Sequence, residues 1–261
     1  MSAFSIIIKY LIRDIARSRM LAFYTTFFLL LSEAFLRFGG SASALLSLSN
    51  VSLLIVPLVT LSFAVMHTYS QQPFHLLLLS QPLERRTLML GMFVGLTIPL
   101  SASYAIGITL PFALRALTGV DGTALMLTLL SGISLTAVFV AIALTIAVSI
   151  DDHAKGFALA ILTWLLLTVF YDGLILVLIR AFSEYPIERA VVVSVIANPI
   201  DLFRTIQMLH FDIAALMGYT GTVLHDSLLS PMGLVGAGTS TIAWITLPYV
   251  AARRRFIRKD F

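Results

Sequence analysis

Three sets of ionisable side chains lie inside stretches of sequence that are otherwise apolar. Asp172 lies within VFYDGLILV, and Glu33 and Arg37 are four residues apart in an earlier apolar run. Burying a charge in hydrocarbon is costly, so such residues usually pair with one another or line a pathway. Asp172 is therefore a candidate conformational latch or pathway residue. A carboxylate that a neighbouring helix holds for structural reasons alone fits the same pattern.

The spacing of Glu33 and Arg37 allows them to pair on one face of a helix. Arg37 can also extend towards the nearer membrane surface, which favours a structural role for this pair. The third set is a single residue, His67, near the end of another apolar run, where we expect it to lie in the membrane interface. Glu33 and Arg37 remain intramembrane candidates beside Asp172.

The sequence lacks the motifs of the common catalytic sites. It has no GxxxxGK[ST] phosphate loop, no glycine-rich nucleotide fingerprint and no HExxH zinc motif. It also lacks a credibly placed Ser/His/Asp set, and it has no cysteine for a thiolate nucleophile or a disulfide. We therefore expect this chain to have no enzymatic activity and no cofactor of its own. The alternative is a self-sufficient intramembrane enzyme or secondary transporter, with Asp172 as a catalytic or proton-coupling group.

Soft potential metal ligands occur in the C-terminal third of the chain: Met208, His210, Met217, His225 and Met232. Thioethers and imidazoles suit copper. However, only Met208 and His210 are close in sequence, and on a helix these two side chains would point apart. We interpret the whole set as packing residues and interface anchors, and we assign no metal site.

Composition identifies the class of protein that must position these side chains. The 261 residues are 59% hydrophobic and 11% charged, whereas a soluble domain is typically ~25% charged. With a mean hydropathy of +0.99, the chain is predicted to be an all-α polytopic membrane protein with one transmembrane domain over residues 1–261. The net charge of +4 has a topological explanation and does not indicate binding to nucleic acid. No cleavable signal peptide is evident.

Six runs are long enough to span a bilayer, which requires ~20 apolar residues. They cover about 20–38, 46–69, 87–117, 124–150, 156–182 and 232–252. Before them, residues 2–18 have apolar side chains on one helical side and basic ones on the other, so we predict a helix in the membrane interface. The apolar side holds Ile6, Ile7, Tyr10, Leu11 and Ile15, and the basic side holds Lys9, Arg13 and Arg17.

The distribution of Lys and Arg predicts the orientation. With six spans both termini share one side, and that side holds twelve basic residues against five on the other. The excess places both termini in the cytoplasm. The segment 183–231 is then extracytoplasmic. On the inside, Asp151-Asp152-His153 could contact a partner or could form a solvated turn.

The stretch from Tyr69 to Arg86, YSQQPFHLLLLSQPLERR, lies between the second and third runs and is polar at both ends. Pro73 can open a short helix over 74–79, and Pro82 lies near its end. We interpret residues 70–87 as a cytoplasmic elbow placed to press on a soluble partner. An ordinary interhelical loop is the alternative.

The extracytoplasmic segment is predicted to hold short helices on or dipping into the outer face. Its apolar piece Val191–Ala197 is too short to span, and Asn198-Pro199 is a turn signal. The following DLFRTIQML is expected to form a short helix that is capped by Asp201 or begins at Pro199.

A basic amphipathic N-terminal helix, six spans, a polar elbow and short helices before the last span together resemble the permease subunits of ABC-2 type transporters. The resemblance implies that the elbow docks as a coupling helix on a separate ATPase subunit, which binds the ATP and Mg. The residues expected to make this contact are Gln72, Phe74, His75, Leu76, Leu77, Leu78, Gln81, Glu84 and Arg85.

The same resemblance implies an assembly in the inner (cytoplasmic) membrane, in contact with lipid, in which two copies of this chain pair with two ATPase subunits. A periplasmic accessory protein would contact the outer segment, with Asn198, Asp201 and Arg204 as the candidate surface. Closure of the ATPases would press on the elbow and be transmitted outwards.

Several segments are similar to the NosY-type permeases within this family: FYTTFFLLLSEAFLRFGG, LLIVPLVTLSF, LLLSQPLERRTLMLGMFVG, VFYDGLILV and NPIDLFRT. Tyr171-Asp172 and Asn198-Pro199-Ile200-Asp201 carry most of this similarity. It implies a role in assembling the copper centres of nitrous oxide reductase. The alternative is an ABC-2 exporter of another cargo, such as a lipid, a drug or a glycan.

Overall fold

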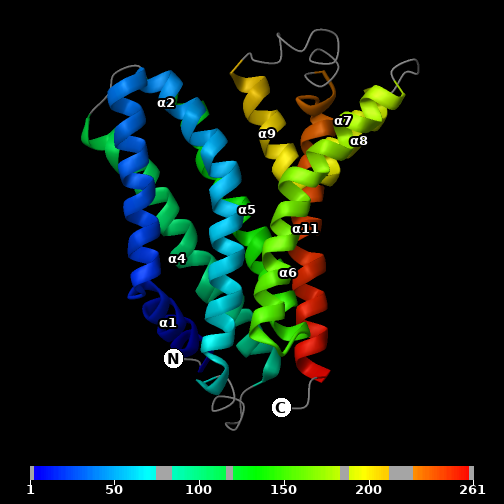
Figure 1. Cartoon of the computed structure of the whole chain (residues 1–261). Helices are drawn as coiled ribbons and strands as arrows, with labels where there is room; N and C mark the ends of the chain where they lie inside the picture. Colours follow the sequence, from blue (N-terminus) through cyan, green and yellow to red (C-terminus); the bar gives the residue numbers. More distant parts are fainter. Residues whose placement is uncertain (1–2, 75–83, 116–119, 183–187, 212–225, 259–261) are drawn as a thin grey trace.

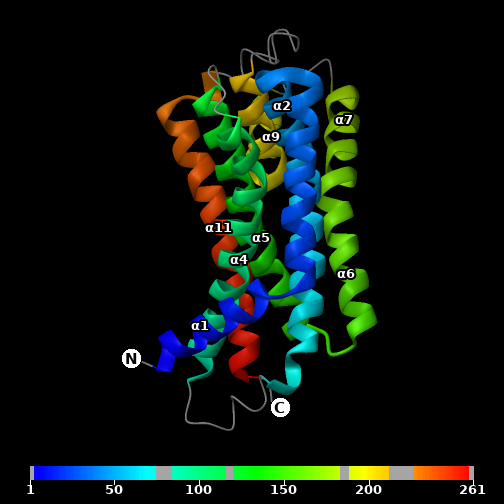
Figure 2. The same cartoon turned by 90° about the vertical axis from the view of Figure 1, so that its left-hand side faces the viewer.

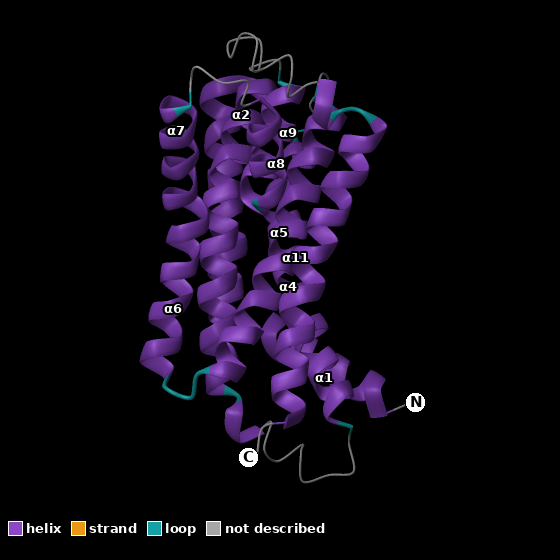
Figure 3. Ribbon diagram, turned by 90° about the vertical axis from the view of Figure 1, so that its right-hand side faces the viewer, coloured by secondary structure: helices purple, strands orange, loops and turns teal. Residues whose placement is uncertain are grey.

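The computed structural model describes residues 3–74, 84–115, 120–182, 188–211 and 226–258, and within these ranges the chain forms helices and no strand (Figure 3). The helices are α1 (Ala3–Ala16), α2 (Arg19–Ser70), α4 (Arg85–Leu114), α5 (Gly122–Ser149), α6 (His153–Leu165), the π-helix Leu166–Phe170, α7 (Tyr171–Ala181), α8 (Glu188–Ala197), α9 (Pro199–His210) and α11 (Pro231–Arg258). The all-α fold class is therefore confirmed for the described residues.

Within the described ranges, five helical stretches are long and apolar enough to cross a membrane: α2, α4, α5, the continuous stretch His153–Ala181, and α11. The bent pair α8 and α9 is a sixth candidate. Helix α2 contains both of the first two predicted runs. Its backbone leaves the helical conformation at Gly40, and the chain before and after this residue runs in opposite directions (Figure 1).

Both chain termini lie at one end of the bundle (Figure 1), which we call the base. The end of α2 and the start of α4, which flank the elbow, lie there too, while the bend between the two arms of α2 lies at the opposite end, the far end. This arrangement agrees with the predicted placement of the termini on one side. The assignment of the base to the cytoplasm remains a prediction from the basic residues.

Helix α1 lies obliquely across the base (Figure 2) and packs on α4. Leu11 and Ile15 are buried and Arg13 is exposed, so the predicted amphipathic pattern is confirmed for these side chains. The contact is close because Gly95 of α4 has no side chain: a Cβ there would lie 2.8 Å from the Leu11 Cβ. Tyr10 departs from the pattern, since it is 53% exposed.

The core of the bundle lies between α2, α4 and α5. Phe28 and Tyr104 meet edge to face with ring centroids 5.0 Å apart, and both are fully buried. The Tyr104 hydroxyl donates to the Thr128 carbonyl at 2.9 Å. A Cβ at Gly132 would lie 2.1 Å from the Tyr104 ring, so a glycine is required for this close packing of α4 on α5.

Polar side chains begin four of the helices by accepting hydrogen bonds from the first backbone N–H groups: Ser18 for α2, Asp121 for α5, Asp152 for α6 and Asn198 for α9. Asp152 belongs to the Asp151-Asp152-His153 loop, whose role the sequence left open. His153 stacks on Tyr69 at the end of α2, with ring centroids 4.5 Å apart. The loop therefore caps α6 and joins it to α2.

Replacing Gly40 should destabilise the protein. Its φ of 73° and ψ of 174° lie in a backbone region that only glycine occupies readily, so Gly40→Ala should cost ~1–3 kcal/mol of unfolding free energy. Gly238→Ala is the matched control, because Gly238 lies inside α11 and its added Cβ would meet nothing within 4 Å. Thermal or denaturant unfolding in detergent measures both. Equal stabilities for the two variants would contradict the strained turn.

Candidate functional site

Helices α8 and α9 enter the bundle from the far end and return to it (Figure 1), so they do not form a sixth span, and we call this bent pair the re-entrant hairpin. The two helices are bent by 114° at Asn198, and the π-helix and Trp244, both half-way along their spans, contact this break. At the far end His210 of α9 bonds to Asp121 through its Nε2 at 2.7 Å. That hydrogen bond, with the backbone N–H of Ala124, holds the pKa of the Asp121 carboxyl below its ordinary value.

The last turn of α8 exposes backbone carbonyls that have no partner within the helix, which is expensive inside a membrane. Side chains from two neighbouring helices supply the donors. Tyr171 donates to the Ser194 carbonyl at 2.8 Å, Trp244 of α11 donates to the Ala197 carbonyl at 2.8 Å, and Ser240 of α11 donates to the Ile196 carbonyl. The end of α8 is thus held by both α7 and α11.

The start of α9 is satisfied from within the hairpin. The Asn198 side chain accepts from the Ile200 N–H at 3.0 Å, and Pro199 at the first helical position has no N–H to satisfy. The cap is therefore Asn198; Asp201 lies in the first turn, so the alternative that begins the helix at Pro199 is confirmed. Asn198 also donates to the Leu167 carbonyl at 2.8 Å, inside the π-helix. Such π turns are rare and are frequent at functional sites.

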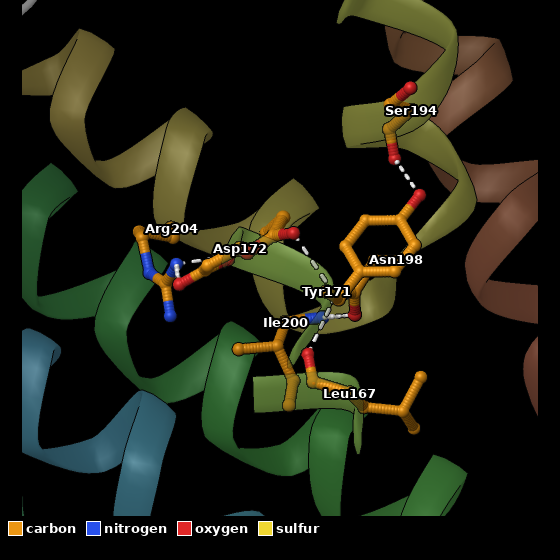
Figure 4. A network of polar contacts seen from close by, with 8 residues as sticks. Leu167, Tyr171, Asp172, Ser194, Asn198, Ile200 and Arg204 are labelled. Carbon is orange, nitrogen blue, oxygen red and sulfur yellow. Dashed lines mark hydrogen bonds and ion pairs between the residues drawn. The ribbon is translucent and has the colours of Figure 1, made fainter. Parts of the chain in front are cut away.

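A charged cluster completes the hairpin's attachment (Figure 4). Arg204 of α9 bonds to Asp172 of α7 and, at 2.9 Å, to Asp201 one turn earlier on its own helix. Asn198 donates to the other oxygen of Asp201 at 3.0 Å. The side chain of Asp201 is 7% exposed, and those of Arg204 and Asp172 are 27% and 36% exposed. We call Asp172, Asn198, Asp201 and Arg204 the hairpin cluster.

The hairpin cluster brings together residues that the sequence assigned to two different roles. Asp172 was a candidate inside the membrane, and the structure gives it a partner on a neighbouring helix. Asn198, Asp201 and Arg204 were predicted to face an extracytoplasmic partner, but Asn198 and Asp201 are buried. Their side chains therefore do not form an outer surface in this structure.

The other ionisable candidates lie apart from this cluster. Glu33 and Arg37 pair at 3.0 Å as predicted, and Arg115 at the end of α4 joins the same carboxylate. This pairing connects α2 to α4. His67 stacks on Phe63 one turn earlier in α2, with ring centroids 5.5 Å apart. Among the described residues, no hydrogen bond or ion pair joins Glu33, Arg37 or His67 to the hairpin.

Four of the predicted coupling residues are described. Gln72 and Phe74 lie at the start of a helix that begins after α2, Glu84 immediately precedes α4, and Arg85 is the first residue of α4. The remaining five, His75, Leu76, Leu77, Leu78 and Gln81, fall outside the described residues.

Among the described residues no group of three or more His, Cys, Asp or Glu side chains could hold a metal ion. Met208 is half-buried and Met232 is 88% exposed, while Met217 and His225 fall outside the described ranges. The hairpin cluster pairs one cation with two carboxylates and an amide, and such a set is suited to holding helices together.

Sequence reasoning missed the donors that satisfy the end of α8, namely Tyr171, Ser240 and Trp244. It also missed the partner of Asp172. One signal was available: an aspartate within an apolar run requires a cation, and Arg204 is the basic residue that follows the Asn-Pro helix break.

Comparison with known proteins gives two findings. A family described as "ABC-2 family transporter protein" matches residues 75–261. A protein of Pseudomonas aeruginosa described as "Probable ABC transporter permease protein NosY" is 26% identical over 223 residues, which cover 78% of this chain and 81% of that protein. The family match includes residues 75–87 of the elbow, the hairpin cluster and all helices from α4 onwards.

The geometry of the hairpin cluster predicts which of two substitutions lowers the free energy of unfolding more. Arg204→Gln leaves two carboxylates side by side without their cation, whereas Asp172→Asn leaves Arg204 paired with Asp201. Breaking a buried ion pair costs ~3–5 kcal/mol of unfolding free energy, and partial exposure of the pair reduces this cost. We therefore expect a loss of roughly 1–3 kcal/mol for Arg204→Gln and of less than half as much for Asp172→Asn.

Unfolding of the two single variants and of the double variant in detergent measures this order and the coupling energy. Arg37→Gln is the matched control, because Glu33 retains Arg115 when Arg37 is lost. If Asp172→Asn is the more destabilising change, the assignment of Arg204 as the shared cation is wrong.

Proposed function

Because the chain belongs to the ABC-2 family of transporters, we propose that it is the membrane-spanning permease subunit of an ABC transporter complex. In this proposal a separate ATPase subunit hydrolyses ATP and presses on the elbow at residues 70–87. The chain transmits that movement across the membrane to the re-entrant hairpin. The observation that carries the proposal is a continuous set of contacts that leads from the flanks of the elbow to both sides of the hairpin.

The first flank of the elbow is attached to α1. Phe74 stacks on Tyr10 with ring centroids 5.1 Å apart, and Gln71 donates to the Asp14 carboxylate at 3.2 Å. A force on the elbow would therefore move the interfacial helix with it.

The same region is attached to α5 and α6. Tyr69, two residues before Gln71, donates to the Ile150 carbonyl at 2.9 Å and stacks on His153. The fit is close, because a Cβ at Gly156 of α6 would lie 1.9 Å from the Tyr69 hydroxyl oxygen. The second flank is attached to α11, where Arg85 donates to the Ile257 carbonyl at 2.8 Å.

Half-way through the bundle, the hairpin is held by the span that begins with α6 and by α11. These are two of the elements that the elbow region contacts at the base. The span that begins with α6 continues through the π-helix to Tyr171 and Asp172, which bond to α8 and α9. Helix α11 contributes Ser240 and Trp244 to the end of α8. A displacement of α6 relative to α11 at the base would therefore also displace the hairpin.

As the finer assignment we propose a role in maturation of the copper centres of nitrous oxide reductase. The resemblance of the segments around Tyr171-Asp172 and Asn198-Pro199 to NosY-type permeases supports it, as does the 26% identity to a protein described as NosY. A second copy of this chain and a periplasmic accessory protein complete the proposed complex. The apolar faces of α7 and α11 leave room for the second copy, because Leu176 is 67% exposed and Leu247 is 70% exposed.

Site-specific crosslinking tests the proposed role of the elbow. The chain has no cysteine, so Gln72→Cys gives a single reactive thiol within the elbow. With a short bifunctional crosslinker in membranes that contain the partner ATPase, we expect this variant to crosslink to the ATPase subunit. Leu114→Cys is the control, since Leu114 is 76% exposed at the far end, and it should give no such product. Crosslinking at position 114 but not at 72 would refute the proposal.

A further inference from the structure

A basic hollow of about 510 Å³ lies at the base between the ends of α5 and α11. Its lining consists of Val148 and Ser149 from the last turn of α5, Asp151 from the following loop, and Arg254, Arg255 and Arg258 from the last turns of α11. Three guanidinium groups against one carboxylate give the hollow a positive charge. The hairpin cluster and the elbow contacts do not use these three arginines.

Contacts at the base hold the last turns of α11, which carry the three arginines, in place. The Ile257 carbonyl accepts from Arg85, and the Arg255 side chain donates to the Ser149 hydroxyl. Phe256 on the same turn is 3% exposed and belongs to the core. The last turns of α11 are therefore attached to α4 and α5, and Arg254 and Arg258 project from a positioned helix.

The depth of the hollow corresponds to the headgroup layer of a bilayer. Helix α11 has 28 residues, so it is about 42 Å long, close to the ~40–45 Å thickness of a bilayer with its headgroups. Its predicted apolar run ends at Ala252, so Arg254 and Arg258 lie about 3 and 9 Å beyond it. The headgroup layer on each side is roughly 5–8 Å thick, so Arg254 lies within this layer. Arg258 lies just beyond its outer edge, and its long side chain can extend back towards the headgroups. Above the arginines lies Leu247, which is 70% exposed and is on nearly the same face of α11 as Arg254 and Arg258, because seven and eleven residues are close to two and three helical turns. An acyl chain would lie along this face.

We propose that this hollow binds the phosphate of an anionic lipid headgroup in the leaflet at the base. Guanidinium groups pair with phosphate oxygens through two parallel hydrogen bonds, which a single ammonium group cannot do. The occupant is a lipid because the upper wall, Val148 and Ser149, belongs to a spanning helix and the adjacent face of α11 is apolar. The alternative occupant is an acidic surface of the ATPase subunit, which would approach from beyond the elbow. This inference rests on the proposed function only where it names the ATPase subunit as the alternative occupant.

Lipid titration tests the site. The full-length chain is reconstituted in nanodiscs of phosphatidylcholine in which phosphatidylglycerol replaces an increasing fraction of the lipid, and the thermal unfolding midpoint is measured. We expect the midpoint to rise and then saturate. In Arg254→Gln/Arg258→Gln the phosphatidylglycerol fraction for half of the rise should be roughly 25-fold larger, since each of the two basic residues near an anionic surface contributes about fivefold in affinity.

Two matched controls distinguish the outcomes. Arg253→Gln/Lys155→Gln removes the same charge at the base but neither residue lines the hollow, so its titration should follow the unaltered protein. Inorganic phosphate without anionic lipid should give no saturating rise, and a full rise would show a site for free phosphate. If both double variants require an equally larger phosphatidylglycerol fraction, the basic end of the protein attracts anionic lipid in general, and the proposal is overturned. So would a normal lipid titration in Arg254→Gln/Arg258→Gln combined with loss of the co-purifying ATPase subunit.

Discussion

A helix that ends inside a membrane must find partners for its terminal backbone groups, because no water is available there. The re-entrant hairpin of α8 and α9 contains such an end and the start of a second helix. Its carbonyls accept from Tyr171, Ser240 and Trp244, and its N–H groups are met by Asn198 or removed by Pro199. The positions of α7 and α11 beside the hairpin follow from this requirement.

The same requirement explains the charged cluster. Arg204 is costly in an apolar environment unless a carboxylate accompanies it, and it bonds to one on α7 and one on its own helix. Apolar packing accompanies these polar contacts. Ile200 of α9 belongs to the main core of the bundle, and Val195, Leu202 and Leu209 form a smaller apolar cluster with Leu228 and with Ala237 of α11.

Periodicity and apolar length were sufficient to predict the helices, the interfacial pattern of Leu11 and Ile15, and the Glu33–Arg37 pair, because each depends on residues close in sequence. The Asn-Pro break was predicted for the same reason. The burial of Asn198 and Asp201 was not predicted, because it depends on contacts with the π-helix and α7, which lie far away along the chain: Asn198 donates to the Leu167 carbonyl, and Arg204 joins Asp201 to Asp172. Counting Arg204 among the outer charges was reasonable for topology, yet it concealed the partner of Asp172.

The central claim is that movement at the elbow reaches the hairpin through α6, α7 and α11. The most direct measurement is a distance between spin labels at Ser70, beside the elbow, and Val193, on the exposed side of α8. It is made in the complex with the ATPase, with and without a non-hydrolysable ATP analogue. A shift of the distance distribution on nucleotide binding, which Arg204→Gln reduces, is the predicted result. An unchanged distribution in a complex that hydrolyses ATP normally would contradict the claim.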